Sequence, residues 1–149
     1  MSENILKLIS ASPDYVPRNV ALQRACELLA SFFPEANETN CEASEEVRFI
    51  DQGQNWERVL CPVCRAELDT TWWQQAMRAA SQTGFTDLSV DLPCCGGVSS
   101  LNDLQYEWPA GFARFALEVH SPGRDIDDKQ LKALEKALGC KLRKIWAHY

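Results

Sequence analysis

Two pairs of cysteines are the residues whose type and spacing most clearly specify chemistry. Cys61 and Cys64 form a CxxC pair, Cys94 and Cys95 are adjacent, and 29 residues separate Cys64 from Cys94. Zinc in structural sites takes four thiolate or imidazole ligands in a tetrahedral arrangement. Two glycines follow the second pair and permit the tight turn that such a loop needs. The sequence therefore predicts one structural zinc ion bound by Cys61, Cys64, Cys94 and Cys95.

The cysteine loops resemble the zinc-ribbon class, in which two CxxC knuckles lie on two hairpins. The first loop, Cys61-Pro62-Val63-Cys64, matches that pattern, whereas in the second, Cys94-Cys95-Gly96-Gly97, the cysteines are adjacent. The resemblance covers only the segment around these loops and implies a zinc site with a structural role. Because neighbouring cysteines bind one metal in a tighter geometry, His120, His148 or Cys41 remain alternative ligands in place of Cys94 or Cys95.

Two other interpretations of the cysteines stay open. A CxxC pair at a helix N-terminus is typical of a thioredoxin-like redox site. Here the nearest helix signal begins only at Thr71, and this interpretation leaves Cys94 and Cys95 unexplained. The four cysteines could also be buried or free thiols without a metal. If they do bind zinc, four thiolates close the coordination shell, and hydrolytic zinc chemistry is not expected.

The composition indicates a soluble, cytoplasmic protein. Of its 149 residues, 46% are hydrophobic, which is enough for a core. It has no apolar run that could span a membrane, and its N-terminus lacks the basic region of a signal peptide. The odd count of seven cysteines and a reducing compartment argue against disulfides. Cys26 and Cys140 are therefore interpreted as small buried hydrophobic residues, and Cys41 as an exposed one.

The order of elements that must position these cysteines predicts an α+β fold. Polar residues 35–46 are predicted to be a connection. A strand–helix–strand order, repeated on both sides of a middle region, is typical of a ferredoxin-like split βαβ sandwich with both helices on one face of the sheet. The predicted strands lie at 5–9, 47–50, 114–120 and 142–149, and the predicted helices at 17–32 and 128–138.

We expect a discontinuous ferredoxin-like domain, residues 1–53 and 109–149, with a zinc-ribbon-like insert, residues 54–108, between its second and third strands. The insert holds four of the five tryptophans. Thr71 and Gln74 have the spacing of a capping box, and the helix predicted after them carries Trp72 and Trp73. Adjacent residues project about 100° apart on a helix, so one of these tryptophans is expected to pack on the cysteine loops and the other on the sheet; alternatively, one is exposed and contacts a partner.

Charge and the absence of catalytic motifs favour a non-enzymatic protein-binding module. The net charge of −6 disfavours nucleic acid and favours a basic protein partner, as is typical of inhibitors and immunity proteins. One alternative is an enzyme that uses a cleft near His120 and His148. Another is a nucleic-acid binder that uses the basic C-terminal segment, which contains Lys129, Lys132, Lys136, Lys141, Arg143 and Lys144. No membrane partner is expected.

Overall fold

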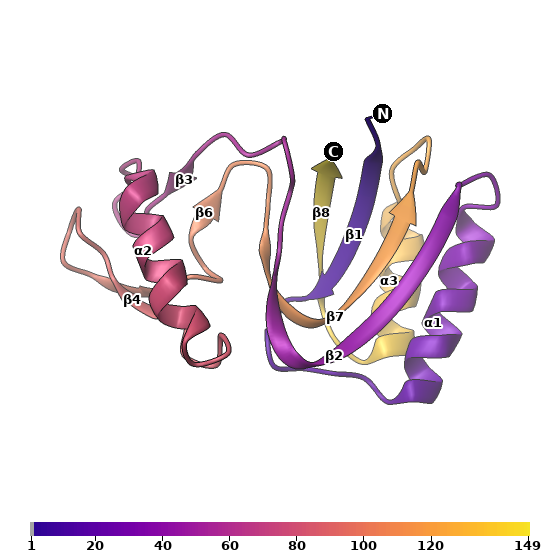
Figure 1. Ribbon diagram of the computed structural model, residues 1–149. Coiled ribbons are helices and arrows are strands. Elements are labelled where there is room, and N and C mark those ends of the chain that lie inside the picture. The colour runs from indigo at the N-terminus through magenta and orange to yellow at the C-terminus, as the bar shows by residue number, and fades with distance from the viewer. Residues whose placement is uncertain (1) are drawn as a thin grey trace.

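The structure, a computed structural model, describes residues 2–149 and is a mixed α/β fold with three helices and a mainly antiparallel sheet (Figure 1). The helices in these residues are α1 (Asn19–Phe32), α2 (Thr70–Ser81) and α3 (Asp128–Leu138). The strands are β1 (Asn4–Ser10), β2 (Glu38–Ile50), β3 (Val59–Leu60), β4 (Ser89–Asp91), β5 (Val98–Ser100), β6 (Gln105–Tyr106), β7 (Gly111–His120) and β8 (Leu142–His148).

Four strands form the main sheet in the order β2-β7-β1-β8, and every neighbouring pair is antiparallel. Helices α1 and α3 cover one face of this sheet (Figure 1). Alternation along β1 directs Leu6 and Leu8 to that face, where they pack in one buried cluster with Leu29 of α1 and Leu134 of α3. The alternating apolar pattern in the sequence thus determines which face of the sheet the helices cover.

The connection that leaves β2 crosses the other face of the sheet and reaches β8. Gly53 forms a parallel bridge with His148, and a Cβ at Gly53 would lie 2.3 Å from the His148 carbonyl oxygen, so this close approach requires glycine. Ile145 is fully buried, and Ala147 nearly so, on the face of β8 opposite the helices. The broken alternation in the sequence of β8 therefore reflects a strand covered on both faces, with no bulge in its pairing to β1.

The segment between β2 and β7 contains α2 and two short two-stranded sheets, β3–β6 and β4–β5. Its buried cluster includes Leu68, Leu92 and Leu104 from this segment. The same cluster continues into the main sheet through Val47 of β2 and Phe112 of β7. Strands of two or three residues form few hydrogen bonds. The stability of the segment therefore depends on this shared core and on the contacts between its loops.

The prediction that residues 35–46 form a connection is wrong, because β2 begins at Glu38. Its first half pairs with β7 from Glu38 opposite His120 to Ala43 opposite Phe115, and the register shifts before Arg48. As an edge strand it has only one paired neighbour, and polar residues at such an edge suppress pairing with other chains. The acidic composition that suggested a loop is therefore compatible with a strand.

The expectation that Cys26 is a lone buried residue and Cys41 an exposed one is also wrong. The structure joins them in a disulfide between α1 and β2, with Cα atoms 5.9 Å apart, and both residues are half-buried. The pairing follows from the polar first half of β2, because Cys41 lies there, beside α1. Cys140, in contrast, is a free, half-buried thiol.

Helix-end signals were predicted with mixed success. The capping box of Asp127 and Gln130 at the start of α3 is confirmed, and Gly139 ends that helix in the left-handed conformation. The predicted capping box of Thr71 and Gln74 is wrong, because Asp69 is the N-cap of α2 and its carboxylate accepts a hydrogen bond from the Thr71 amide. Across residues 2–149 no helix has the length and apolarity needed to cross a bilayer.

Reduction of the Cys26–Cys41 disulfide should destabilise the sheet domain. The two cysteines are 15 residues apart in the sequence, and closing a loop of that size stabilises a fold by about 3 kcal/mol. Denaturant unfolding with and without a phosphine reductant should therefore show a loss of up to about 3 kcal/mol. A Cys26→Ala/Cys41→Ala variant should match the reduced protein and show no response to reductant. Equal stability of oxidised and reduced wild-type protein would contradict this.

Candidate metal centre

The four predicted cysteine ligands come from two loops of the insert. Cys61 and Cys64 lie in the turn that follows β3, and Cys94 and Cys95 lie in the turn that joins β4 to β5. The structure brings all four sulfur atoms within 4.8 Å of one another. Two loops separated by 29 residues of sequence thus meet at one point, and this arrangement could hold a metal ion.

The two loops share one hydrogen-bonding plan. In the first loop the Cys61 amide donates to Ala66 and the Arg65 amide donates to Cys61. In the second loop the Leu92 amide donates to Gly97 and the Gly96 amide donates to Leu92. Arg65 and Gly96 also share a positive φ, 67° and 74°. Residues 61–66 and 92–97 are therefore equivalent positions of two knuckles.

This equivalence explains the adjacent cysteines of the second loop. Cys95 corresponds to Cys64, but the position that corresponds to Cys61 is taken by Leu92, which is buried. The missing sulfur comes instead from Cys94, which occupies the position of Val63 in the first loop. The second knuckle therefore supplies two sulfur atoms from a different pair of positions, which spacing alone does not reveal.

The sulfur geometry fits a single ion. Cys64 and Cys94 have sulfur atoms 3.3 Å apart, and those of Cys61 and Cys95 are 3.9 Å apart. A tetrahedral ion with metal–sulfur bonds of about 2.3 Å separates its ligand atoms by about 3.8 Å. Small shifts of exposed side chains would bring the observed separations to that value, because Cys64, Cys94 and Cys95 all lie at the surface.

The pKa values of the clustered thiols shift in opposite directions, as expected for thiols that cannot all ionise without a cation between them. Burial raises the pKa of Cys61, but amide donors from Cys64 and Val63, at 3.4 and 3.3 Å from its sulfur, outweigh burial and lower that pKa to about 6. Hydrogen bonding to Cys64, with burial, raises the pKa of Cys94 to about 12. The thiols cannot all ionise beside one another, whereas a divalent ion at their centre would let all four do so.

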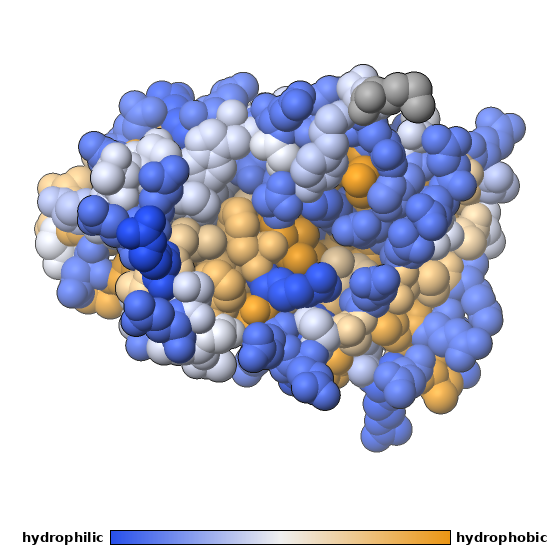
Figure 2. Space-filling view, in the orientation of Figure 1, coloured by the Kyte–Doolittle hydropathy of each residue, from blue (hydrophilic) through white to orange (hydrophobic). Residues whose placement is uncertain are grey.

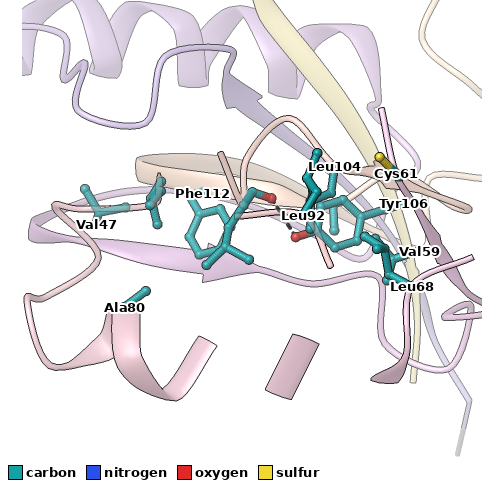
Figure 3. Packing of buried hydrophobic residues seen from close by; sticks show 12 residues of the cluster. Val47, Val59, Cys61, Leu68, Ala80, Leu92, Leu104, Tyr106 and Phe112 are labelled. Atoms are coloured by element: carbon teal, nitrogen blue, oxygen red, sulfur yellow. Dashed lines mark hydrogen bonds between the residues drawn. The ribbon is translucent and has the colours of Figure 1, made fainter. Parts of the chain in front are cut away.

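Cys61 also connects the centre to the hydrophobic core of the insert. It is fully buried, unlike the other three cysteines. In Figure 3 it lies at one end of the cluster, near Leu104 and Tyr106, whereas Val47 and Ala80 lie at the other. Loss of order at the metal centre should therefore disturb the packing of the insert as well as its loops.

The three alternative ligands lie elsewhere in the structure. Cys41 is bonded to Cys26. His148 contacts the Asn4 side-chain oxygen at 2.7 Å through Nδ1. His120 contacts Glu3 through Nδ1 and Glu118 through Nε2, the latter at 3.2 Å. None of the three joins the cysteine cluster, and strand β1 separates the two histidines.

The CxxC pair also lacks the setting of a redox site. Helix α2 begins at Thr70, and its N-cap is Asp69, so neither Cys61 nor Cys64 lies in the first turn of a helix. The helix dipole that activates such thiols is therefore directed at other residues. The four sulfur atoms instead face one another, as ligands of one ion would.

Trp72 and Trp73 both pack against the core, as the first of the two expectations had it, and the alternative of an exposed helix tryptophan is wrong. Trp73 packs in an aromatic cluster with Phe49 and Trp56, and its indole N–H donates to the Tyr106 hydroxyl at 3.1 Å. Trp72 is half-buried against the same core. Neither is an exposed helix residue, and Trp108 is instead the most exposed tryptophan of the chain.

A buried polar network near the junction of sheet and insert was not predicted. Lys7 of β1 is 6% exposed, and its ammonium group donates to the Asp51 carbonyl at 3.0 Å and to the Tyr149 hydroxyl at 2.7 Å. The Tyr149 hydroxyl in turn donates to the Asp51 carboxylate. This network holds the connection after β2 against the sheet. Its residues are far apart in the sequence, so no local signal could have identified it.

No family model matches this chain, and neither curated proteins nor solved structures provide a match.

Replacing Cys61 with serine should remove the metal and destabilise the insert. The variant loses one of four ligands and places a hydroxyl in the buried position, so we expect about one metal ion per wild-type chain and almost none in C61S. The loss of stability should be several kcal/mol, because metal binding contributes to folding in such sites. Cys140→Ser, a free cysteine outside the cluster, should keep the metal. A metal-free wild-type protein of full stability would contradict the assignment.

The equivalence of the two knuckles gives a sharper version of this test. Cys94→Ala should lose the metal, and adding Leu92→Cys should restore it, because position 92 corresponds to Cys61 in hydrogen bonding and burial. Metal content and thermal unfolding of both variants measure the effect. If the double variant stays metal-free although folded, the two loops are not equivalent around the ion.

His120 should titrate above its ordinary pKa and make stability depend on pH. Burial lowers its pKa, but hydrogen bonds to Glu3 and Glu118 outweigh burial and raise it above 6.5. Its contribution is therefore fully present below about pH 6.5 and is lost as pH rises through the folded-state pKa. NMR titration of the ring protons gives the pKa directly, and His120→Gln should remove this part of the pH dependence. A pKa at or below 6.5 would contradict the contacts.

Proposed function

We propose that this protein is a zinc-stabilised, non-enzymatic protein-binding module, of the kind represented by inhibitors and immunity proteins. The observation that carries the proposal is the convergence of Cys61, Cys64, Cys94 and Cys95. Four thiolates around one ion leave no open position for a water or a substrate. Such an ion stabilises a fold, and the function then belongs to the folded surface.

Zinc is the metal that this ligand set favours. Four sulfur ligands in a tetrahedral arrangement are typical of zinc or of iron–sulfur centres. Sulfur atoms that all lie within 4.8 Å of one another suit a single ion of zinc size better than a multinuclear cluster. Elemental analysis for zinc and iron in the same sample separates the two.

We infer a ferredoxin-like domain, residues 1–53 and 109–149, interrupted by a zinc-ribbon-like insert, residues 54–108. The strand order β2-β7-β1-β8 with antiparallel neighbours supports this, as do α1 after β1 and α3 after β7 on one face. The shared hydrogen-bonding plan of the two cysteine loops supports the second part. In this arrangement the sheet is a scaffold that presents the insert.

The contacts of the histidines support a non-enzymatic role. The carboxylates of Glu3 and Glu118 contact the two ring nitrogens of His120. These contacts favour the charged imidazolium and leave no free nitrogen to act as a general base. A cavity of about 500 Å³ lies at this end of the sheet, lined by Glu3, Asn4 and Trp146 among others, but neither histidine lines it. The enzyme alternative would need a different set of catalytic groups.

The nucleic-acid alternative depends on the C-terminal lysines. Lys129, Lys132 and Lys136 are exposed at helical spacing on α3 and form no ion pairs within residues 2–149. Two other basic residues of this segment are engaged, since Arg143 donates to the Asn102 and Ala110 carbonyl groups and Lys144 pairs with Asp125. Strong salt dependence of binding to DNA or RNA would favour this alternative.

A cytoplasmic location belongs to the same proposal. It requires that the Cys26–Cys41 pair be reduced in the cell, because disulfides are rare in reducing compartments. The zinc site has the same requirement, since thiolates bind the ion and disulfides do not.

Capture of a partner from an extract of the native host tests the proposed function. Zinc-loaded protein should retain one protein, expected to be basic given the charge of −6, and nuclease treatment should leave it bound. His120→Gln and His148→Gln, provided that they fold, should bind it within about twofold of wild type, because neither residue is assigned to the surface. Failure to enrich any protein over a mock bait, or loss of the captured partner after nuclease treatment, would contradict the proposal.

A further inference from the structure

Trp108 is presented to solvent in a way that distinguishes it from the other tryptophans. It is 44% exposed, whereas Trp56, Trp72, Trp73 and Trp146 are all half-buried. It lies between β6 and β7, where the chain returns from the insert to the sheet. Figure 2 shows apolar residues gathered in the middle of the visible face of the molecule, with hydrophilic residues around them. An exposed indole at this junction is therefore not part of the core.

The backbone holds this side chain in an unfavourable conformation. Trp108 has φ 56°, in the left-handed region that bulky residues avoid, and it precedes Pro109, where extended backbone is usual. The conformation is fixed on both sides of the residue. Its carbonyl accepts a hydrogen bond at 3.0 Å from the side-chain amide of Gln52, a residue that is only 1% exposed. On the other side, the Glu107 backbone amide donates to the Arg58 backbone carbonyl at 3.0 Å.

One carboxylate contacts the exposed indole, and the residue before Trp108 carries a second. The indole N–H of Trp108 donates to Glu57 at 3.3 Å, and Glu107 is the preceding residue. Arg58 pairs with Glu107 at 2.9 Å and also interacts electrostatically with Glu57, whose carboxylate forms no ion pair of its own within residues 2–149. An aromatic face next to a carboxylate that forms no ion pair attracts a cationic group through both the ring quadrupole and the charge.

We propose that Trp108 and Glu57 form the anchor point for an arginine or lysine side chain of the protein partner. The inference rests on the proposed protein-binding function and assigns the surface that performs it. The held backbone presents the ring without further ordering, which lowers the entropy cost of binding. Tryptophan is one of the residue types enriched among binding hot spots. The charge of −6 on the whole chain adds long-range attraction for the same partner.

The test uses an octa-arginine peptide as the probe and ¹⁵N-labelled, zinc-loaded protein. We expect a saturable shift of the Trp108 indole signal at physiological salt. Trp108→Ala should weaken binding at least about fivefold, the range of a partly desolvated cation–π contact. Glu57→Gln should weaken it by about threefold or more. Glu45→Gln, an identical charge change at an exposed position of β2, should change affinity by less than about twofold.

The remaining outcomes overturn the assignment. These are a peptide that shifts signals elsewhere and leaves Trp108 unchanged, equal losses in the Glu57 and Glu45 variants, and a shift of Trp108 with octa-glutamate or single-stranded DNA in place of octa-arginine. If Trp108→Ala does not fold, the shift of the Trp108 indole signal in the wild-type spectrum still tests the proposal. A captured partner that binds Trp108→Ala as tightly as wild type would refute the anchor while leaving the protein-binding function intact.

Discussion

The close approach of four cysteine sulfur atoms is the constraint on which the rest of the insert depends. These atoms come from two loops and lie within 4.8 Å, so the four thiols can ionise together only around a cation. Without that cation, only the shared core and strands of two and three residues would hold the loops in place. An ion bound there would act as the cross-link that the short strands cannot provide.

The effect of this cross-link extends beyond the loops because the buried core is continuous. Cys61 packs in the same cluster as Phe112 of β7, and Phe49 of β2 contacts the ring of Trp73. The polar network around Lys7 fixes the connection after β2, and Gln52 of that connection fixes the backbone of Trp108. Buried packing and hydrogen bonds thus connect the metal centre, the core and the junction, and they hold the backbone that carries the exposed indole.

Local patterns in the sequence were sufficient for the features that depend on local physics. Alternation located β1 and β7, the Asp127 cap and Gly139 delimited α3, and cysteine spacing identified the four sulfur residues. Each of these signals is carried by neighbouring residues and needs no knowledge of the fold. The helical pattern of residues 17–32 likewise gave the helix that α1 forms.

Features that depend on tertiary contacts were missed for a common reason. The first half of β2 is polar because it is an edge, and the disulfide of Cys26 with Cys41 becomes visible only once that strand is placed beside α1. Leu92 could not be recognised as the counterpart of Cys61 before the hydrogen bonds of both loops were known. Edge position, cross-links and pseudo-equivalent loops are properties of the assembled structure rather than of short segments.

X-ray absorption spectroscopy of the metal-loaded protein tests the central claim most directly, because it measures the ligand shell itself. The account predicts a zinc edge with four sulfur atoms at about 2.3 Å and no nitrogen or oxygen ligands. A shell that mixes sulfur with nitrogen or oxygen at about 2.0–2.1 Å would contradict it, since an imidazole or water would then replace one of the four cysteines.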